Sequence, residues 1–246
     1  MKRIQFLDTD MDVASMDETI NWIDQRIESR LFTQHVVVNV AKLVNMRRDS
    51  LLRRSVINCD LINIDGMGVV WGARLLGINI PERVSGIDLF HELLALAERK
   101  DYPVFFLGAH QEVVEKAVSV LQQQYPSLQI AGFHHGYFWE NEETVVDTVR
   151  SSGARLLFVA ISSPKKEKFI DRWQDQLGVD FVMGVGGTFD VVAGKVKRAP
   201  LWMQRNGLEW LYRVIQEPGR MWKRYLVTNS KFALLLLKEK INQVTN

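Results

Sequence analysis

Short apolar runs alternate with helical patterns from residue 35 to residue 186, and this alternation restricts the fold more than any other feature of the chain. Near-continuous apolar runs are typical of strands that are buried on both faces of a sheet. Strands that alternate with helices form mostly parallel sheets, so the sequence predicts a Rossmann-like α/β fold with flanking helices. The predicted strands are 35–40, 61–65, 103–108, 128–133, 154–161 and 180–186.

Helix signals lie between these runs and replace them after about residue 195. Ser15 and Glu18 have the spacing of a capping box at the start of a helix over residues 16–29. Near the C-terminus the helical patterns carry three tryptophans, and no strand signal follows. We therefore predict a Rossmann-like body over residues 1–195 and a C-terminal helical appendage over residues 196–246.

The composition excludes several classes of protein. With 47% hydrophobic residues among 246, the chain buries a sizeable core and is not disordered. The single cysteine, Cys59, has no partner for a disulfide or a thiolate metal cluster, which favours a reducing cytoplasm. The N-terminus lacks the apolar segment of a signal peptide, and the apolar run 232–237 is far shorter than the ~20 residues of a spanning helix.

Positive charge is concentrated in the tail. The stretch from Lys195 to Asn246 holds 11 Lys and Arg but 3 Asp and Glu, although the whole chain has a net charge of +2. Cations interleaved with Trp and Tyr are typical of a helix that lies on an anionic bilayer. Nucleic acid attracts the same cations, but the apolar run 232–237 favours a membrane. The structural alternative is a helix packed on its own body or on a second copy.

Asp65 is the best-placed candidate for catalysis. It ends the predicted strand 61–65 and is followed by Gly66 and a helical pattern. In an open parallel sheet, ligands bind beyond the carboxyl ends of the strands, where a carboxylate can accept a proton from a substrate hydroxyl. The alternative is that Asp65 caps the following helix, and the spacing alone does not decide between the two roles.

Residues 184–190, with the sequence GVGGTFD, have the composition of a phosphate-binding loop. Their glycines let backbone N–H groups approach a phosphate closely, although glycines also serve ordinary turns. Phe189 stands where the dinucleotide fingerprint needs its third glycine, which argues against a nicotinamide-dependent oxidoreductase. Asp190 suits a ribose or sugar hydroxyl, while a helix cap is the plainer role.

Cations precede two other predicted helices. Arg83 comes just before a helix start near Ser85 or Asp88, and the segment 162–169 carries three lysines at another helix start. Cations beside free helix N–H groups form an anion site, although surface lysines are usually just solvated.

Metal sites are not expected. Asp8 and Asp10 form the D-x-D pattern with which many glycosyltransferases hold a divalent ion, but they precede the capping-box helix, where acidic residues complement the helix dipole. His134 and His135 are adjacent and lack the spacing of a ligand pair.

Several segments together resemble the WecG/TagA/CpsF family of glycosyltransferases, also called glycosyltransferase family 26. They run in order over nearly the whole chain, and the ordered set is far more specific than any one of them. The matching segments are DGMGVVWG (65–72), ERVSGIDL (82–89), FLGA (106–109), HGYF (135–138), SPKKE (163–167), GVGGTFDVVAGKVKRAP (184–200), GLEWLYR (207–213) and EPGR (217–220).

The resemblance implies an inverting, metal-independent and cofactor-free transfer of a ManNAc, ManNAcA or glucose-type sugar from a UDP-sugar to an undecaprenyl-diphosphate-linked sugar. It makes Asp65 the general base, which favours catalysis over capping. It also implies homo-oligomers and a peripheral place on the inner face of the cytoplasmic membrane. The implied donor-binding residues are Asn39, Gly66, Arg83, Gly108, Pro164, Lys165, Lys166, Glu167, Gly184, Gly186, Gly187, Thr188 and Asp190. The implied contacts to the acceptor diphosphate and the membrane are Lys197, Arg198, Arg213, Arg220 and Arg224.

Two residues depart from the family pattern Gly-x-Pro-Lys-Gln-Glu. Ser162 replaces its glycine and Lys166 replaces its glutamine, and both departures bear on the choice of donor sugar. The alternative to an enzyme is a catalytically silent peripheral membrane protein that binds lipid phosphates or nucleotide-sugars.

Overall fold

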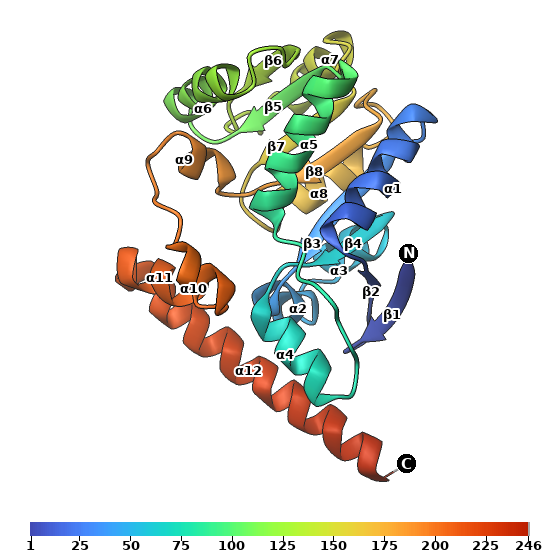
Figure 1. The fold of residues 1–246 in the computed structure, drawn as a ribbon, viewed down its shortest axis with the longest axis vertical. Helices are drawn as coiled ribbons and strands as arrows, with labels where there is room; N and C mark the ends of the chain where they lie inside the picture. Colours follow the sequence, from blue (N-terminus) through green and yellow to red (C-terminus); the bar gives the residue numbers. More distant parts are fainter. Residues whose placement is uncertain (246) are drawn as a thin grey trace.

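A six-stranded sheet is the centre of the computed structural model, which describes residues 1–245 apart from the side chains of Arg220, Val244 and Thr245 (Figure 1). Its strands run parallel in the order β4-β3-β8-β7-β5-β6. They are β3 (Thr33–Val38), β4 (Leu61–Ile64), β5 (Val104–Gly108), β6 (Ile130–His134), β7 (Leu156–Ala160) and β8 (Phe181–Gly184). Each overlaps one predicted strand, so the predicted α/β fold is confirmed.

Helices cover both faces of this sheet. The capping box at Ser15 and Glu18 forms as predicted and starts α1. One face carries α1 (Met16–Glu28), α5 (Gly86–Lys100) and α6 (Gln111–Gln124), and the short α9 (Thr188–Val192) packs beside them. The other carries α2 (Val40–Met46), α3 (Ser50–Ile57), α7 (Glu142–Ser151) and α8 (Lys165–Trp173).

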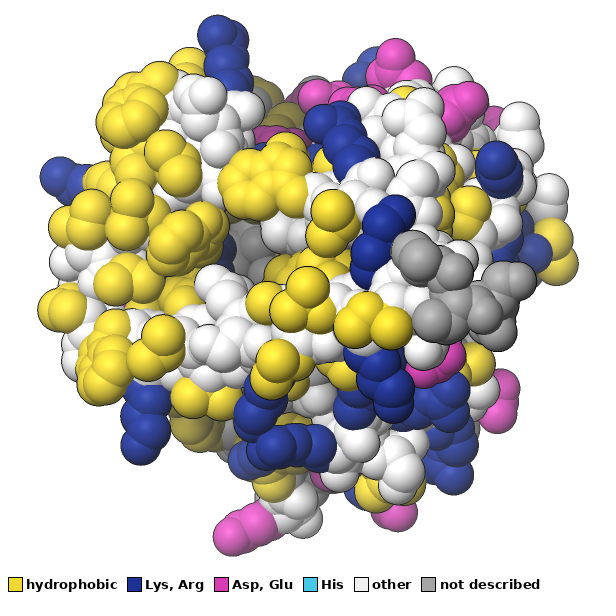
Figure 2. Space-filling view, turned by 90° about the horizontal axis from the view of Figure 1, so that it is seen from below, with side chains coloured by type: hydrophobic (Ala, Val, Ile, Leu, Met, Phe, Trp, Pro, Cys, Tyr) yellow, Lys and Arg dark blue, Asp and Glu magenta, His cyan; other side chains and the backbone are white. Residues whose placement is uncertain are grey.

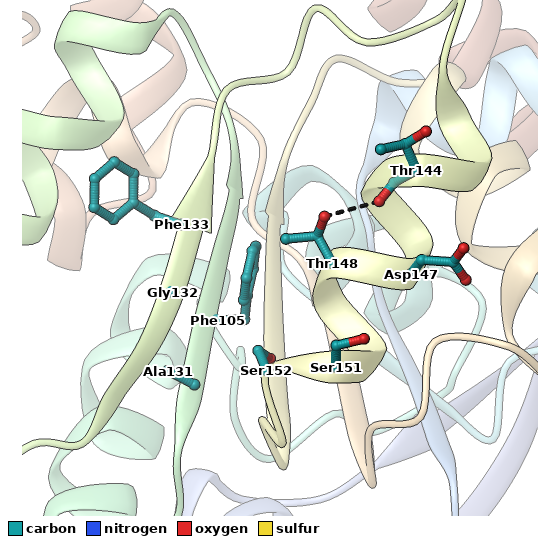
Figure 3. A pocket seen from close by; sticks show the side chains of 9 residues that line it. All are labelled: Phe105, Ala131, Gly132, Phe133, Thr144, Asp147, Thr148, Ser151 and Ser152. Carbon is teal, nitrogen blue, oxygen red and sulfur yellow. Dashed lines mark hydrogen bonds between the residues drawn. The ribbon is translucent and has the colours of Figure 1, made fainter.

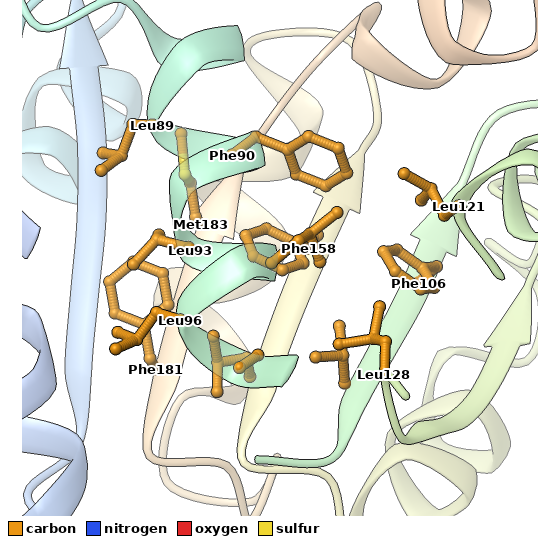
Figure 4. Close-up of a cluster of buried hydrophobic side chains, with 14 of the residues drawn as sticks. Leu89, Phe90, Leu93, Leu96, Phe106, Leu121, Leu128, Phe158, Phe181 and Met183 are labelled. Atoms are coloured by element: carbon orange, nitrogen blue, oxygen red, sulfur yellow. The ribbon is translucent and has the colours of Figure 1, made fainter. Parts of the chain in front are cut away.

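The strands alternate their side chains between two apolar layers, as a period of two requires. On β5, Phe106 packs into the α5–α6 layer and Phe105 into the α7–α8 layer. In the first layer the rings of Phe90 and Phe158 meet edge to face with centroids 4.8 Å apart (Figure 4). Because both faces are covered, the carboxyl edge of the sheet is where polar loops gather.

The sequence analysis missed an N-terminal hairpin of β1 (Lys2–Phe6) and β2 (Thr9–Val13). Leu7 and Asp8 make its two-residue turn, and both have positive φ. Asp12 pairs with Arg3 at 2.8 Å and accepts a hydrogen bond from the backbone of Ile62, which ties the hairpin to β4. Asp8 and Asp10 therefore precede α1 as parts of a hairpin, and the acidic residues in the first turn of α1 are Asp17 and Glu18.

The tail forms three helices and packs on the body. They are α10 (Leu201–Arg205), α11 (Glu209–Gln216) and α12 (Pro218–Thr245). Phe232 and Leu236 of α12 are buried in the same cluster as α4 (Met67–Leu75), where a methyl group on Gly72 would lie 2.9 Å from the ring of Phe232. The predicted helical appendage is thus observed, and its division from the body at residue 195 stays a prediction. Among the described residues, no helix combines the length and apolarity needed to cross a bilayer.

Gly108 at the end of β5 is a strict requirement of this fold. Its φ is +132°, and an added methyl would lie 2.4 Å from the carbonyl oxygen of Ala160. We expect Gly108→Ala to lower the free energy of unfolding by about 3 kcal/mol or more, measured by urea denaturation.

Gly77→Ala is the matched control for this substitution. Gly77 also has positive φ, but nothing lies within 4 Å of its added methyl. Gly77→Ala should lower the free energy of unfolding by about 1 kcal/mol, through backbone strain alone. Equal losses for the two variants would contradict a steric role for Gly108.

Candidate active site

The predicted site residues meet at the carboxyl edge of the sheet. Asn39 follows β3, Asp65 follows β4, Gly108 ends β5, and the segment 162–167 and the Gly-rich loop follow β7 and β8. From β5 the chain continues to β6 on one side, and from β7 it continues to β8 on the other. Such a switch point opens a crevice between strand ends, which is where ligands bind in open α/β sheets.

Asp65 does not cap a helix. The N-cap of α4 is Gly66, and no side chain caps this helix. The Asp65 side chain is 26% exposed, and the nearest guanidinium nitrogen of Arg83 lies 4.0 Å away. Desolvation is the largest effect on its pKa and outweighs Arg83, so the pKa is raised to about 6. A carboxylate that ionises near neutral pH is suited to accept a proton.

An ion-pair network joins the tail to this carboxylate. Arg83 lies 2.6 Å from Glu209 of α11, and Glu209 raises the pKa of Asp65. Arg198 makes a two-pronged contact with Asp88 of α5, at 2.5 and 2.8 Å. Half-buried charge pairs therefore hold α11 and the segment around Arg198 near Asp65.

Asn39 is positioned by the start of α2. Its side-chain oxygen accepts a hydrogen bond from the backbone of Lys42 at 3.0 Å, which makes Asn39 the N-cap. A methyl on Gly66 would lie 3.3 Å from the Cβ of Asn39, so the loops after β3 and β4 touch. Asn39 and Asp65 therefore lie on neighbouring loops at the carboxyl edge of the sheet.

A buried charge cluster lies at the start of α8. The ammonium of Lys42 lies 2.9 Å from Oε1 of Glu167, and Lys166 donates to the same oxygen. Burial raises the pKa of Glu167, but the two cations together outweigh it and lower the pKa to about 2. Sequence reasoning missed Lys42, although one lysine inside the apolar stretch 35–46 is a signal of a buried cation.

Lys165, in the same segment 162–167, lies apart from this charge cluster. Lys165 lies over the ring of Trp139 at 4.7 Å from its centroid, away from Lys166, and follows the cis peptide bond that precedes Pro164.

In the Gly-rich loop, Thr188 donates to the carbonyl of Val185 at 2.8 Å, and Gly186 has positive φ.

Two of the predicted acceptor contacts in the tail lie near charged groups at the carboxyl edge of the sheet. Arg213 is close enough to lower the pKa of Asp65, and Arg224 is close enough to lower that of Lys166. Lys197 is exposed, and its backbone carbonyl accepts from Gln216. The side chain of Arg220 lies outside the described part of the structure.

An exposed aromatic pair at the ends of β5 and β6 was not predicted. Tyr137 is 61% exposed, and its hydroxyl lies 2.7 Å from Nε2 of His110. Gly136 sits against the backbone of Gly108, where a methyl would come within 3.1 Å. The segment HGYF (135–138) could have predicted this pair, because an aromatic residue beside a glycine at a strand end is suited to stack on a planar ligand.

A separate hollow lies at the β6 edge of the sheet (Figure 3). It is lined by β5, β6 and α7, and within it Thr148 donates to the carbonyl of Thr144 at 2.8 Å. It contains none of the predicted site residues.

Comparison with known proteins defines the class first. The model of the "Glycosyl transferase WecG/TagA/CpsF family" matches residues 4–246, so the chain is a glycosyltransferase of the hexosyl-transferring kind. It belongs to the WecG/TagA/CpsF family, as its motifs predicted.

Its curated relatives include three enzymes named N-acetylglucosaminyldiphosphoundecaprenol N-acetyl-beta-D-mannosaminyltransferase. The relative from Bacillus subtilis is 36% identical over 92% of this chain and 85% of its own length. The relative from Bacillus spizizenii is 31% identical over 98% and 91%. The relative from Staphylococcus aureus strain MW2 is 33% identical over 90% and 86%.

Glu209 is expected to set the ionisation of Asp65. In Glu209→Gln, a nearby negative charge disappears and Arg83 loses its closer partner, so the pKa of Asp65 falls from about 6 toward its usual value of about 4. Carboxyl ¹³C NMR titration measures this, with Asp65→Asn to assign the signal. Glu143→Gln on α7 is the control, and an unchanged pKa in Glu209→Gln would contradict the network.

Proposed function

We propose that the protein transfers a sugar of the ManNAc, ManNAcA or glucose type from a UDP-sugar to an undecaprenyl-diphosphate-linked sugar, with inversion and without a metal ion. The observation that carries this proposal is Asp65, a desolvated carboxylate with a pKa of about 6 at the carboxyl edge, beneath a cationic tail. The names of the relatives support a lipid-diphosphate acceptor, since those proteins are named for undecaprenol-linked N-acetylglucosamine.

In the proposed reaction, Asp65 takes the proton of the acceptor hydroxyl as that oxygen attacks the anomeric carbon. The attack comes from the face opposite UDP, so the bond to the UDP oxygen breaks as the new glycosidic bond forms. The proton ends on Asp65, and the electron pair of the broken bond leaves with UDP. One displacement inverts the configuration.

We propose that the donor binds against the loops after β5, β6, β7 and β8. The exposed ring of Tyr137 offers a stacking surface for the uracil base, beside the close backbone approach of Gly108 and Gly136. The Gly-rich loop offers backbone N–H groups to the diphosphate. Nearby lysines and arginines supply the charge that the leaving UDP needs, so we propose that chelation by EDTA leaves turnover unchanged.

The outer face of α12 supports contact with a membrane. Met221, Phe232 and Leu236 face the protein, whereas the opposite side of this helix is apolar and exposed (Figure 2). Lysines and arginines flank it, as in helices that lie in an anionic bilayer surface. The exposed apolar residues of this side are Leu226, Val227, Leu234, Leu237 and Ile241. We propose that this face docks on the inner face of the cytoplasmic membrane.

Turnover should require ionised Asp65. Asp65→Asn is expected to lower kcat/KM by about 100- to 10,000-fold, measured as UDP release from a panel of UDP-sugars with a short polyprenyl-diphosphate-linked acceptor. In the wild type, kcat/KM should fall about tenfold per pH unit below the pKa of about 6, because the protonated carboxyl cannot accept a proton.

The stability of the variant is its control. A raised pKa means that the folded protein favours protonated Asp65 over ionised Asp65. The stability that protonated Asp65 contributes is therefore present in full below about pH 4 and is lost as the pH rises through 6. The neutral Asp65→Asn should therefore melt no lower than wild type at pH 8. A folded variant with full turnover would exclude Asp65 as the base, and a wild type that binds vesicles but turns over no donor would favour the silent membrane protein.

Membrane docking should depend on the outer face of α12. Leu234 and Leu237 are exposed and lie on one side of this helix, so changing both to Glu should reduce co-sedimentation with phosphatidylglycerol vesicles at least tenfold. Leu31→Glu, at another exposed leucine, which precedes β3 at the amino edge of the sheet, is the control. Undiminished vesicle binding by the double variant would rule out this face.

A further inference from the structure

The charges of the buried cluster beside the Gly-rich loop do not sum to zero. Lys42, Lys166 and Glu167 are 6%, 9% and 3% exposed, and both ammoniums share the single oxygen Oε1 of Glu167. Two cations and one anion leave an excess of one positive charge inside the protein. Burying an uncompensated charge costs several kcal/mol, so this arrangement is unfavourable in the protein alone.

In the described part of the structure, no second carboxylate lies within 4 Å of either ammonium. Among the described residues, Glu167 is the carboxylate in contact with these ammoniums, and the next charge that acts on Lys166 is the cation of Arg224. Burial and Lys42 together lower the pKa of Lys166 to about 8. Two ammoniums offer six N–H donors, and Glu167 accepts two of them.

The cluster lies against the loop that we propose as the donor site. The chain of Lys166 runs so close to Gly184 that a methyl there would lie 2.6 Å from Cε. Lys42 is fixed by the cap of Asn39, next to Gly66. Oε2 of Glu167 is buried and has no hydrogen-bond partner in the described structure. Spare donors and one spare acceptor therefore lie together next to Gly184, where the Gly-rich loop begins.

We propose that Lys42, Lys166 and Glu167 form a buried subsite that binds an anionic group of the donor through the two ammoniums and a sugar hydroxyl through Oε2. This inference rests on the proposed function and names the chemistry of its donor. Two groups of a UDP-sugar carry the required charged oxygens, namely the β-phosphate and, in a hexuronate, the carboxylate at C6. In either case the ligand supplies the missing negative charge.

A subsite that is strained when empty makes an unusual prediction about stability. Lys166→Gln leaves Lys42 and Glu167 as a neutral pair, so the ligand-free variant should melt at or above the wild-type temperature. Glu167→Gln leaves two ammoniums without a counter-charge and should melt well below it. A cluster that serves stability alone would lose melting temperature in both variants.

Binding, measured by calorimetry, identifies the anionic group. The probes are uridine, UDP, UDP-glucose and UDP-glucuronate, tested with wild type, Lys166→Gln and Lys42→Met, and with Lys116→Gln on the exposed side of α6 as the matched control. If the group is the β-phosphate, both variants bind UDP and both UDP-sugars at least tenfold more weakly and uridine unchanged. If it is the carboxylate, UDP-glucuronate alone weakens at least tenfold.

Two results would overturn the proposal. One is affinities within twofold of wild type for every probe in both folded variants. The other is an equal loss for uridine, which would place the effect outside the charged part of the donor. Because these readouts are binding constants, they stand apart from turnover. A subsite that binds as proposed in a protein without transferase activity would contradict the proposed function and leave the subsite intact.

Discussion

A parallel sheet places the carboxyl ends of all its strands on one edge, and the candidate active site depends on that constraint. Asn39, Asp65, Gly108 and Gly184 are far apart in the sequence, yet each ends or follows a strand of the same sheet. The two apolar layers of helices close both faces, so the loops at this edge are where polar groups meet solvent. Gly108 shows how tightly the edge is packed, because its backbone lies against that of Ala160.

Two groups of charges at this edge are incompletely compensated, one of them negative and the other positive. Asp65 is desolvated and only partly compensated by Arg83, because Glu209 engages the same guanidinium more closely. On the other side, Lys42 and Lys166 share one carboxylate. The proposed glycosyl displacement without a metal needs a base that ionises near neutral pH and a cationic site for a leaving or bound anion. The tail contributes to both, through Glu209 and through Arg213 and Arg224.

Much of the fold followed from local sequence patterns. The apolar runs predicted each strand of the six-stranded sheet, and Ser15 with Glu18 predicted the start of α1. Both signals depend only on residues that are close together in the sequence. The β1–β2 hairpin was missed because Leu7 stands at a turn position with positive φ, where Gly, Asn or Asp is usual, and because Asp12 finds its partners at Arg3 and Ile62.

The site was predicted less completely, since its geometry depends on contacts between distant segments. Order along the chain placed Asp65 at a strand end, but its burial and its link to Glu209 come from a tail helix more than a hundred residues away. Lys42 gained a role only when α8 brought Glu167 beside it. Membership of the family fits the placement of these residues, and their individual roles remain proposals.

The stereochemistry of the product tests the central claim most directly. With a UDP-sugar that turns over and carries an α-linked sugar, the one-bond carbon–hydrogen coupling at the anomeric centre of the lipid-linked product distinguishes the two anomers. A single displacement assisted by Asp65 predicts a β-linked product, as the names of the relatives state for theirs. An α-linked product would contradict the account, because retention requires a second step that a lone base opposite UDP does not provide.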